Sequence, residues 1–327
     1  MKSHFKRIFL LFSACCMITL SGCSGSTIED GRTIGIIQYA QHPALDQAYQ
    51  GFVDTLEQQG YGDTITIETY NAQNDPSNVE TIANTLVNSN VDLIYAIGTP
   101  AAQGVASKTT SIPIIISAVT DPQQSGLVET NELPNTNISG TSDASDASAL
   151  VDLLLAIVPN AKTVGIMYCS SEDNSTIQAN QYQQLLNEQG INVEIFTVSD
   201  SASVQSVAES AYGKVDAMMI PTDNLLAETM PLVASILNGY GIPTVVGEPA
   251  LVESGGLATE GINYYHLGEE SASMAIEVLE GADISTMPIY FASKADLTRC
   301  FNQESIDALG LTIDPSVLDG ATIYPLQ

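Results

Sequence analysis

The sequence predicts an α/β protein of two similar lobes, each a doubly wound parallel sheet, joined by a hinge that the chain crosses three times. Three observations favour this fold. Apolar runs of strand length alternate with segments of helical periodicity, which is typical of parallel sheets with helices on both faces. Residues 33–36 (TIGI) recur as residues 163–166 (TVGI). The 327 residues are also enough for two domains.

The repeat keeps its register through both halves of the chain. Residues 92–95 (DLIY) correspond to residues 216–219 (DAMM), and residues 112–113 (IP) correspond to residues 242–243 (IP). Because the offset is the size of a domain, the pattern indicates two similar lobes and not a solenoid.

Each unit reads as alternating strands and helices. Pro43 and Pro76 stand at the first turn of two helical segments, and Gly60 follows the first of them. In the first unit we expect strands at 33–39, 65–70, 91–97 and 113–117 and helices at 43–59 and 76–88. In the second we expect strands at 163–168, 191–197, 215–220 and 243–246 and helices at 177–188, 204–211 and 225–238.

The remaining segments connect the two units. We expect strands at 137–141, 257–262 and 287–292, a helix at 264–280 that packs back on the first lobe, and a helix near 302–309. The chain then crosses between the lobes near 141–143, 261–264 and 290–296. A hinge of several strands restricts the lobes to opening and closing around a central cleft.

The predicted domains follow from these crossings. Lobe 1 comprises residues 32–141 and 264–290, and lobe 2 comprises residues 142–263 and 291–327.

The amino-terminal residues are expected to be a leader. Lys2, Lys6 and Arg7 precede an apolar run at 8–20, which is the length of a signal peptide and short for a membrane span. The following L-S-G-C resembles a bacterial lipobox, which implies removal of residues 1–22 and a lipid on Cys23. Residues 23–31 then form a flexible tether. The alternative is an ordinary secretory signal with a chance cysteine.

Composition excludes several classes of protein. Lys and Arg number 9 against 38 Asp and Glu, a formal net charge of −29, so nucleic acid would be repelled. An apolar fraction of 44% excludes a disordered chain. Cys169 and Cys300 remain after the leader, and the sequence leaves open whether they pair or stay free.

A ligand site is expected where the strands end, because open parallel sheets bind ligands beyond the carboxyl ends of their strands. Thr99 before Pro100 reads as a helix cap, whose hydroxyl and free N–H groups suit a carboxylate. Residues 117–120 offer further hydroxyl and N–H groups at the next strand end. The alternative is that Thr99 only caps its helix.

Asp223 occupies the position in the second unit that Thr99 occupies in the first. A pseudo-twofold axis would place the two across the cleft, so a zwitterion would find an anion site facing a carboxylate. Asp223 could instead serve only as a helix cap. Asp121 and Asp143 are weaker candidates for an ammonium partner.

Signatures of catalysis and metal binding are missing from the sequence. His42, before Pro43, is either a ligand contact or a surface cap, and His266 reads as a helix-face residue. No Cys/His cluster, phosphate loop or nucleophile motif is present, so we expect no enzyme, no metal and no cofactor. The chain has no Trp, and Arg32 and Arg299 lie outside the strand-end loops, which favours an amino acid over a sugar.

These loops resemble the amino-acid-binding lipoproteins of bacterial ABC importers, in the type I periplasmic-binding-protein fold, a group that includes tryptophan binders. The resemblance rests on the segments IGIIQY with HPALD, NAQ, IGTPAA, SAVTDP, GTSD, SSEDN, PTDN and GINYY, which run in order through the chain. Cys169 departs from the pattern, which has Asn before SSED.

The resemblance implies a set of ligand contacts. The ligand's carboxylate would meet Thr99, Ala101 and the Ala118, Val119 and Thr120 loop, and its ammonium would meet Asp223. Its side chain would lie against Gln38, His42, Pro43 and Leu45. Matching segments add further candidates: Asp143, Ser170, Ser171, Asn174, Thr222 and Asn224.

The implied function is capture of a small amino acid, aromatic such as tryptophan, and delivery to an ABC permease by hinge closure. The protein is expected to be a monomer outside the cytoplasm, held at the cell membrane by its lipid alone. Three alternatives remain: a ligand-sensing lipoprotein for a membrane receptor, a branched-chain amino acid as ligand, and an extracellular hydrolase, for which no nucleophile–base pair is found.

Overall fold

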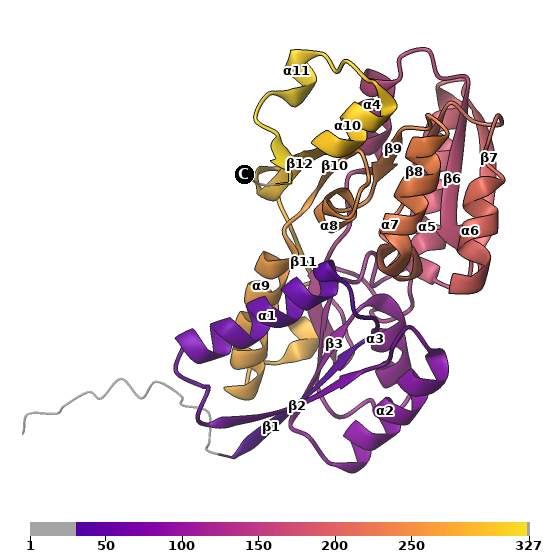
Figure 1. Ribbon diagram of the computed structural model, residues 1–327. Coiled ribbons are helices and arrows are strands. Elements are labelled where there is room, and N and C mark those ends of the chain that lie inside the picture. The colour runs from indigo at the N-terminus through magenta and orange to yellow at the C-terminus, as the bar shows by residue number, and fades with distance from the viewer. Residues whose placement is uncertain (1–30, 326–327) are drawn as a thin grey trace, which may run out of the picture.

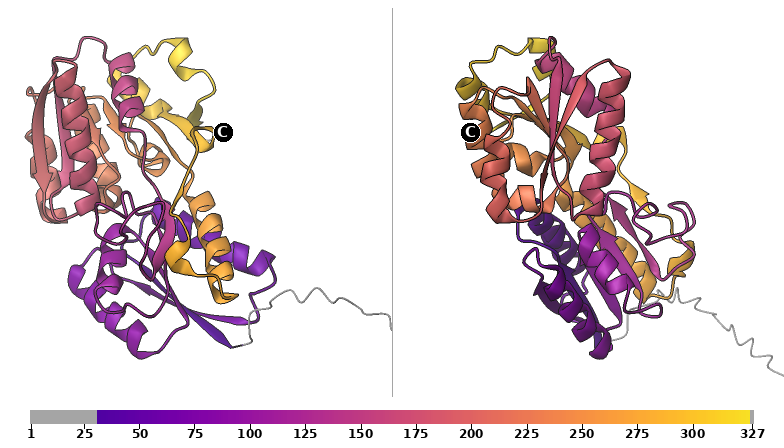
Figure 2. Two further views of the ribbon diagram at one scale, coloured as in Figure 1. Left: turned by 180° about the vertical axis from the view of Figure 1, so that it is seen from behind. Right: turned by 90° about the vertical axis from the view of Figure 1, so that its right-hand side faces the viewer.

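The computed structural model describes residues 31–325, and the leader and Cys23 lie outside them. Two lobes stand end to end, lobe 1 below and lobe 2 above in Figure 1, and the same division is visible in both views of Figure 2. Each lobe is built on one sheet. The predicted fold of two similar parallel-sheet lobes is confirmed.

Lobe 1 contains a six-stranded sheet in the order β11-β5-β4-β3-β1-β2, with every neighbouring pair parallel. Helices α1 and α9 pack together on one face, and α2 and α3 on the other. The strands are β1 Arg32–Gln38, β2 Ile65–Asn71, β3 Leu93–Ile97, β4 Ile114–Ser117, β5 Ile138–Ser142 and β11 Tyr290–Phe291. The helices are α1 Pro43–Gln58, α2 Pro76–Asn88, α3 Thr99–Ala106 and α9 Tyr264–Leu279.

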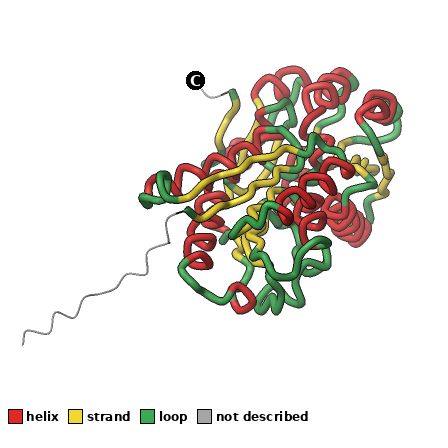
Figure 3. Tube along the Cα trace, turned by 90° about the horizontal axis from the view of Figure 1, so that it is seen from below, coloured by secondary structure: helices red, strands yellow, loops and turns green. Residues whose placement is uncertain are grey.

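Lobe 2 contains a seven-stranded sheet in the order β13-β12-β10-β9-β8-β6-β7. Figure 3 shows strands lying between helices. The strands are β6 Thr163–Cys169, β7 Asn192–Val198, β8 Ala217–Ile220, β9 Thr244–Val246, β10 Ala258–Ile262, β12 Leu297–Asn302 and β13 Thr322–Tyr324. The helices are α4 Ala147–Ile157, α5 Asp173–Glu188, α6 Ser201–Glu209, α7 Asn224–Gly239, α8 Pro249–Glu253, α10 Gln303–Leu309 and α11 Pro315–Leu318, with short 3₁₀ turns at Ile284–Thr286 and Lys294–Asp296.

The internal repeat is visible in matching hydrogen bonds. In lobe 1 the Asp92 Oδ2 atom accepts the backbone N–H of Thr33 at 2.8 Å. In lobe 2 the Asp216 Oδ2 atom accepts the backbone N–H of Thr163 at 3.0 Å. Each aspartate precedes the third strand of its unit and ties it to the first strand, so the two sheets begin in the same way.

Several elements differ from the sequence-based expectation, among them the unpredicted helices α8 and α11 and strands β12 and β13. Helix α4 was not predicted, although Asp146 caps it by accepting the N–H groups of Ser148 and Ala149. Strand β12 pairs antiparallel with β10. The reason is topological: β10 runs toward the junction of the lobes, whereas β12 starts there after the last crossing and must run away from it.

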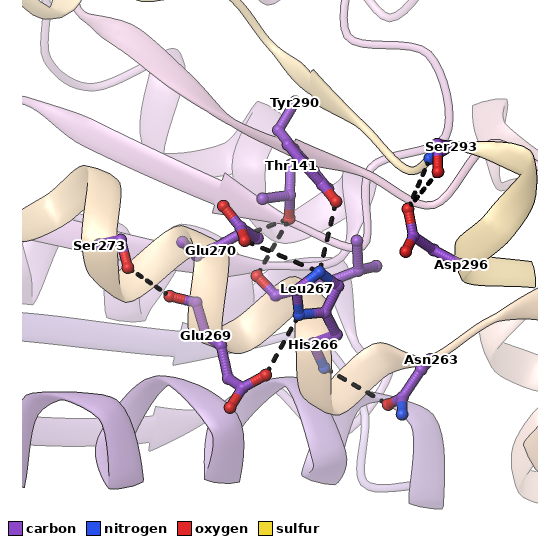
Figure 4. A network of polar contacts seen from close by, with 11 residues as sticks. Thr141, Asn263, His266, Leu267, Glu269, Glu270, Ser273, Tyr290, Ser293 and Asp296 are labelled. Carbon is purple, nitrogen blue, oxygen red and sulfur yellow. Dashed lines mark hydrogen bonds and ion pairs between the residues drawn. The ribbon is translucent and has the colours of Figure 1, made fainter. Parts of the chain in front are cut away.

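The crossings are braced against one another, as Figure 4 shows. Asn263 lies between β10 and α9 and caps α9 by accepting the backbone N–H groups of Tyr265 and His266. The His266 ring contacts the Tyr290 hydroxyl of β11 at 3.3 Å and the Glu269 carboxylate at 3.1 Å. His266 is therefore a helix-face residue, as predicted, and it links two of the segments that join the lobes.

Each lobe has its own apolar core. In lobe 1 the rings of Phe52 and Tyr95 stack with their centroids 3.9 Å apart beneath α1. In lobe 2 apolar side chains pack on both faces of the sheet. Cys169 and Cys300 are both buried and free. Within residues 31–325, no helix combines the length and hydropathy of a membrane span.

Helix α9 returns the chain to lobe 1 by a very close approach to α1. A Cβ atom on Gly268 would lie 2.1 Å from the backbone oxygen of Ala48, closer than any real contact. We expect Gly268→Ala to lower the free energy of unfolding by about 1–3 kcal/mol, because the helices must separate. Urea unfolding measures this, with Gly239→Ala as control, since nothing lies within 4 Å of a Cβ there. Equal stability of the two variants would contradict the packing described.

Candidate ligand-binding site

A small, narrow cavity lies between the lobes, where the strands of both sheets end. All ten residues that line it are buried. Eight were predicted from the sequence: His42, Leu45, Ala118, Asp143, Asn174, Thr222, Asp223 and Asn224. The other two are Glu248 and Tyr264. The strand-end rule therefore led to residues that enclose a cavity between the lobes.

Lobe 1 supplies one wall from the residues that follow β1, β4 and β5. His42 precedes α1, and Leu45 follows three residues later on the same side of its first turn. Ala118 follows β4 with a φ of +55°, in the left-handed region that side chains other than glycine rarely adopt. Asp143 follows β5 and accepts the hydroxyls of Thr120 at 2.9 Å and Tyr264 at 2.6 Å.

Lobe 2 supplies the opposite wall from the amino-terminal end of α7. Asp223 caps this helix, since its Oδ1 atom accepts the backbone N–H of Leu226 at 2.8 Å. Its Oδ2 atom accepts the backbone N–H of Cys169 at 2.6 Å. Cys169 thus holds Asp223 through its main chain, a contact that does not depend on its side chain. The cap role, one of two readings of Asp223 from sequence, is confirmed.

A second carboxyl group serves the same helix end. Glu172 is buried and accepts the backbone N–H groups of Asn224 and Leu225, each at 3.2 Å. Burial, together with the charge of Asp223, raises the pKa of Glu172, and burial raises the pKa of Asp223. The amino-terminal end of α7 offsets part of this cost through its free N–H groups and its dipole.

Glu248 brings a further acid to the cavity, from the loop after β9. Burial, with smaller contributions from the charges of Asp143 and Asp223, raises its pKa to about 8. Burial also raises the pKa of Asp143. His42 contributes an imidazole ring to the lining, and burial lowers its pKa to about 4. The cavity wall is therefore acidic, with a neutral imidazole and without Lys or Arg.

Several hydrogen bonds join the lobes directly around the cavity. The His42 Nε2 atom lies 3.2 Å from Asn224 Oδ1. The Gln178 side chain of lobe 2 donates to the Thr120 hydroxyl of lobe 1 at 3.2 Å and also to the Thr222 hydroxyl. These contacts describe a cleft that is closed.

Two more contacts join the lobes outside the cavity. Gln103 of α3 donates to Asp173 of α5 at 2.9 Å, and Asn74 donates to Glu228 of α7 at 3.3 Å. Each pairs a side-chain amide with a carboxylate across the junction of the lobes. The closed arrangement thus continues to the protein surface.

The other predicted residues do not line this cavity. The side-chain amide of Gln38 donates hydrogen bonds to the Ala40 carbonyl and to the Asp46 carboxylate. Pro43, Ser170 and Ser171 are exposed. The remaining predicted residues are buried but are not part of the lining: Thr99, Ala101, Val119 and Thr120.

Two local expectations from the sequence are wrong. Thr99 is not the cap of α3 but its first residue, because Gly98 takes the cap position with a φ of +96°, which favours glycine. The Thr99 hydroxyl is buried and finds no hydrogen-bond partner among the described residues. Helix α5 begins at Asp173 and not at 177, so Asn174 lies in its first turn.

Four polar residues of the site were missed by sequence reasoning. Glu248 and Tyr264 each follow a predicted strand, so the strand-end rule would have found them had it been applied at those ends. Glu172 also follows a predicted strand and stands in the SSEDN segment, whereas Gln178 lies within α5, where no local signal marks it. Within the described part of the chain, no group of three His, Cys, Asp or Glu side chains is arranged to hold a metal ion.

Comparisons with known proteins agree with this architecture. The family model of ABC transporter substrate binding proteins matches residues 33–323. A tyrosine-binding protein of Clostridioides difficile is 39% identical over 282 residues, covering 86% of this chain and 81% of that protein. A leucine binding protein from Thermotoga maritima shares the fold, with a TM-score of 0.61 at 15% identity, over 82% of this chain and 93% of that one.

Two solved structures of similar sequence differ in how well they superimpose. An ABC domain in complex with L-Trp from Streptococcus pneumonia has a TM-score of 0.84 at 37% identity, covering 89% of this chain and 99% of that one. A ligand-free, open structure of a substrate binding protein with adhesive properties from Clostridium difficile has a TM-score of 0.69 at 38% identity. The match covers 90% of this chain and 100% of that one. The lower score with the open structure agrees with the closed cleft of this chain. The chain belongs to the family of ABC transporter substrate-binding proteins, in the type I periplasmic-binding-protein fold.

Proposed function

We propose that this protein is an extracytoplasmic lipoprotein that captures an aromatic amino acid between its lobes and passes it unchanged to an ABC permease. The observation that carries the proposal is the buried cavity, which both lobes line and whose charged side chains are all carboxyl groups. Charges buried in a protein need a partner of opposite sign. The ammonium group of an amino acid supplies it.

The opposite end of the ligand has a separate place on lobe 1. The Thr99 hydroxyl is buried without a partner in the first turn of α3, where free N–H groups and the helix dipole favour an anion. A Cβ atom added to Gly98, beside it, would lie 3.7 Å from Leu45 Cδ1 and 3.9 Å from Asn224 Oδ1 of the lining, so this helix start is close to the cavity. A carboxylate here and an ammonium among the acids would orient a zwitterion across the cavity.

Closure of the lobes is the proposed mechanism. Because every lining residue is buried, a ligand reaches the cavity only when the lobes separate. The ligand then shifts the balance toward closure by the contacts that it makes in the closed form alone. The pairs Gln103–Asp173 and Asn74–Glu228 form only on closure, so a permease that contacts this surface would distinguish the loaded protein from the open one.

Relatives favour an aromatic amino acid as the ligand. Two relatives bear on the side chain, one named as a tyrosine-binding protein and one solved with L-Trp. We also propose that the protein is a monomer and does not catalyse a reaction.

Removing one acid should weaken binding. We expect Glu248→Gln to lower the affinity for L-tyrosine or L-tryptophan at least tenfold, about 1.4 kcal/mol, because the cavity loses an acid near the ammonium. Calorimetric titration of protein refolded to remove bound ligand measures this. Asp121→Asn, an acid of a neighbouring loop that does not line the cavity, is the matched control and should change affinity less than twofold. Unchanged affinity of the Glu248 variant would remove this acid from the site.

Ligand binding should also release protons. At pH 7 a carboxyl group with a pKa of about 8 is largely protonated, and an incoming ammonium favours its ionised form. Titrations at pH 7 in buffers of different ionisation enthalpy should show a fraction of a proton leaving per ligand, and fewer with Glu248→Gln. A binding enthalpy that is independent of the buffer would contradict the acidic cavity.

The same raised pKa sets the sign of the stability change with pH. The folded, ligand-free protein binds more protons at Glu248 than the unfolded chain does between pH 4.5 and 8, so this contribution to stability is lost as pH rises. The lowered pKa of His42 makes stability rise with pH, but only between about pH 4 and pH 6.5. Urea unfolding without ligand should therefore show stability falling from pH 6.5 to 8.

The lipid anchor is testable by a single substitution. We expect Cys23→Ala to move the protein from the membrane fraction to the soluble extracytoplasmic fraction, because no lipid is attached. Ser26→Ala, in the same segment, should leave it in the membrane fraction. Membrane retention of the Cys23 variant would show that something other than a lipid holds the protein there.

A further inference from the structure

A chain of hydrogen bonds across the cleft fixes the orientation of the Asn224 side chain. Its Nδ2 atom donates to Glu172 Oε2 at 2.5 Å. The oxygens of Glu172 act as acceptors, since they also receive the backbone N–H groups of Asn224 and Leu225. Only the amide nitrogen of Asn224 can donate, so its oxygen must face the other way, toward His42.

That orientation determines where the His42 ring carries its proton. The Nε2 atom lies 3.2 Å from the Asn224 oxygen, which can only accept, so Nε2 bears the hydrogen. Burial lowers the pKa of His42 to about 4, so the ring is neutral at pH 7. In a neutral imidazole the second nitrogen, Nδ1, is then an acceptor.

This acceptor has nothing to accept within the protein. The Nδ1 atom is buried and finds no hydrogen-bond partner among the described residues, although His42 lines the cavity. A buried polar atom without a partner is costly, and in a binding cavity it selects a ligand that supplies the missing donor.

The surroundings of His42 differ from those of the acids. Leu45 lies beside it and adds an apolar surface to the same wall. The charges of Asp143 and Asp223 raise the pKa of Glu248, whereas Asp46, outside the cavity, is the acid whose charge acts on His42. The apolar side chain of Leu45 and the single acceptor on His42 together suit an aromatic ring that carries a polar hydrogen. The acids suit the ammonium group.

We propose that His42 Nδ1 accepts a hydrogen bond from the side chain of the ligand. The ligand is then an aromatic amino acid whose ring carries an O–H or N–H donor, and His42 discriminates against rings without one. This inference rests on the proposed function, since it concerns the side chain of the amino acid that the cavity is proposed to hold.

Calorimetric titration with matched ligands tests the assignment. Wild-type protein should bind L-tyrosine at least tenfold tighter than L-phenylalanine, and L-tryptophan at least tenfold tighter than its naphthylalanine analogue, which lacks the N–H. In His42→Leu both ratios should fall to within twofold, because the unpaired acceptor is gone. His42→Gln, which keeps an acceptor, should retain part of the preference.

Each other outcome contradicts the proposal in a distinct way. If His42→Leu weakens tyrosine and phenylalanine equally, His42 acts on the shared part of the ligand or on the fold. If the wild type does not distinguish the paired ligands, the proposal fails even should the variant not fold. If no aromatic amino acid binds the wild type, it is the proposed function that fails.

A second readout needs no substitution. The sequence has three histidines, and only His42 and His266 lie beyond the leader, so their ring nitrogens can be assigned in ¹⁵N-labelled protein. At pH 7 the Nδ1 of His42 should be unprotonated, and L-tyrosine should shift its resonance as a new hydrogen bond does, while L-phenylalanine should not. A proton on Nδ1 would overturn the assignment.

Discussion

The structure depends on carboxyl groups that are buried where the two lobes meet. Asp143, Glu172, Asp223 and Glu248 all lie there, and the cavity lining contains neither Lys nor Arg. Burying such groups without a counter-charge is expensive, and each is therefore held by donors or partly protonated. Glu172 and Asp223 use the amino-terminal end of α7, and Asp143 uses hydroxyl groups. The lining supplies no cation, and we propose that the ammonium group of the ligand takes this place.

The duplicated fold explains how such a site arises. Both sheets begin with the same aspartate-to-strand hydrogen bond, so their strands end at corresponding places on the two sides of the cleft. The lobes have diverged in the residues at those ends: in lobe 1 Gly98 takes the cap position and Thr99 begins α3, whereas in lobe 2 Asp223 itself caps α7. One scaffold used twice thus presents a hydroxyl with free N–H groups at the start of α3 and an acid at the start of α7.

Much of this was predictable from sequence, because strand ends and repeats are local signals. Alternating strands and helices placed most elements within a few residues, and the strand-end rule found Asp143 and Asp223. What it could not find depends on contacts between distant residues. The pairing of Glu172 and Asn224 with His42 joins residues far apart in the chain. The direction of β12 follows from where the last crossing ends.

A crystal structure of the protein with its bound amino acid tests the central claim most directly. The account predicts that the ligand's ammonium nitrogen lies about 2.7–3.2 Å from carboxyl oxygens of the acidic wall. It also predicts that residues of both lobes touch the ligand. A ligand gripped by one lobe alone, or seated with its carboxylate among Asp143, Asp223 and Glu248, would contradict it.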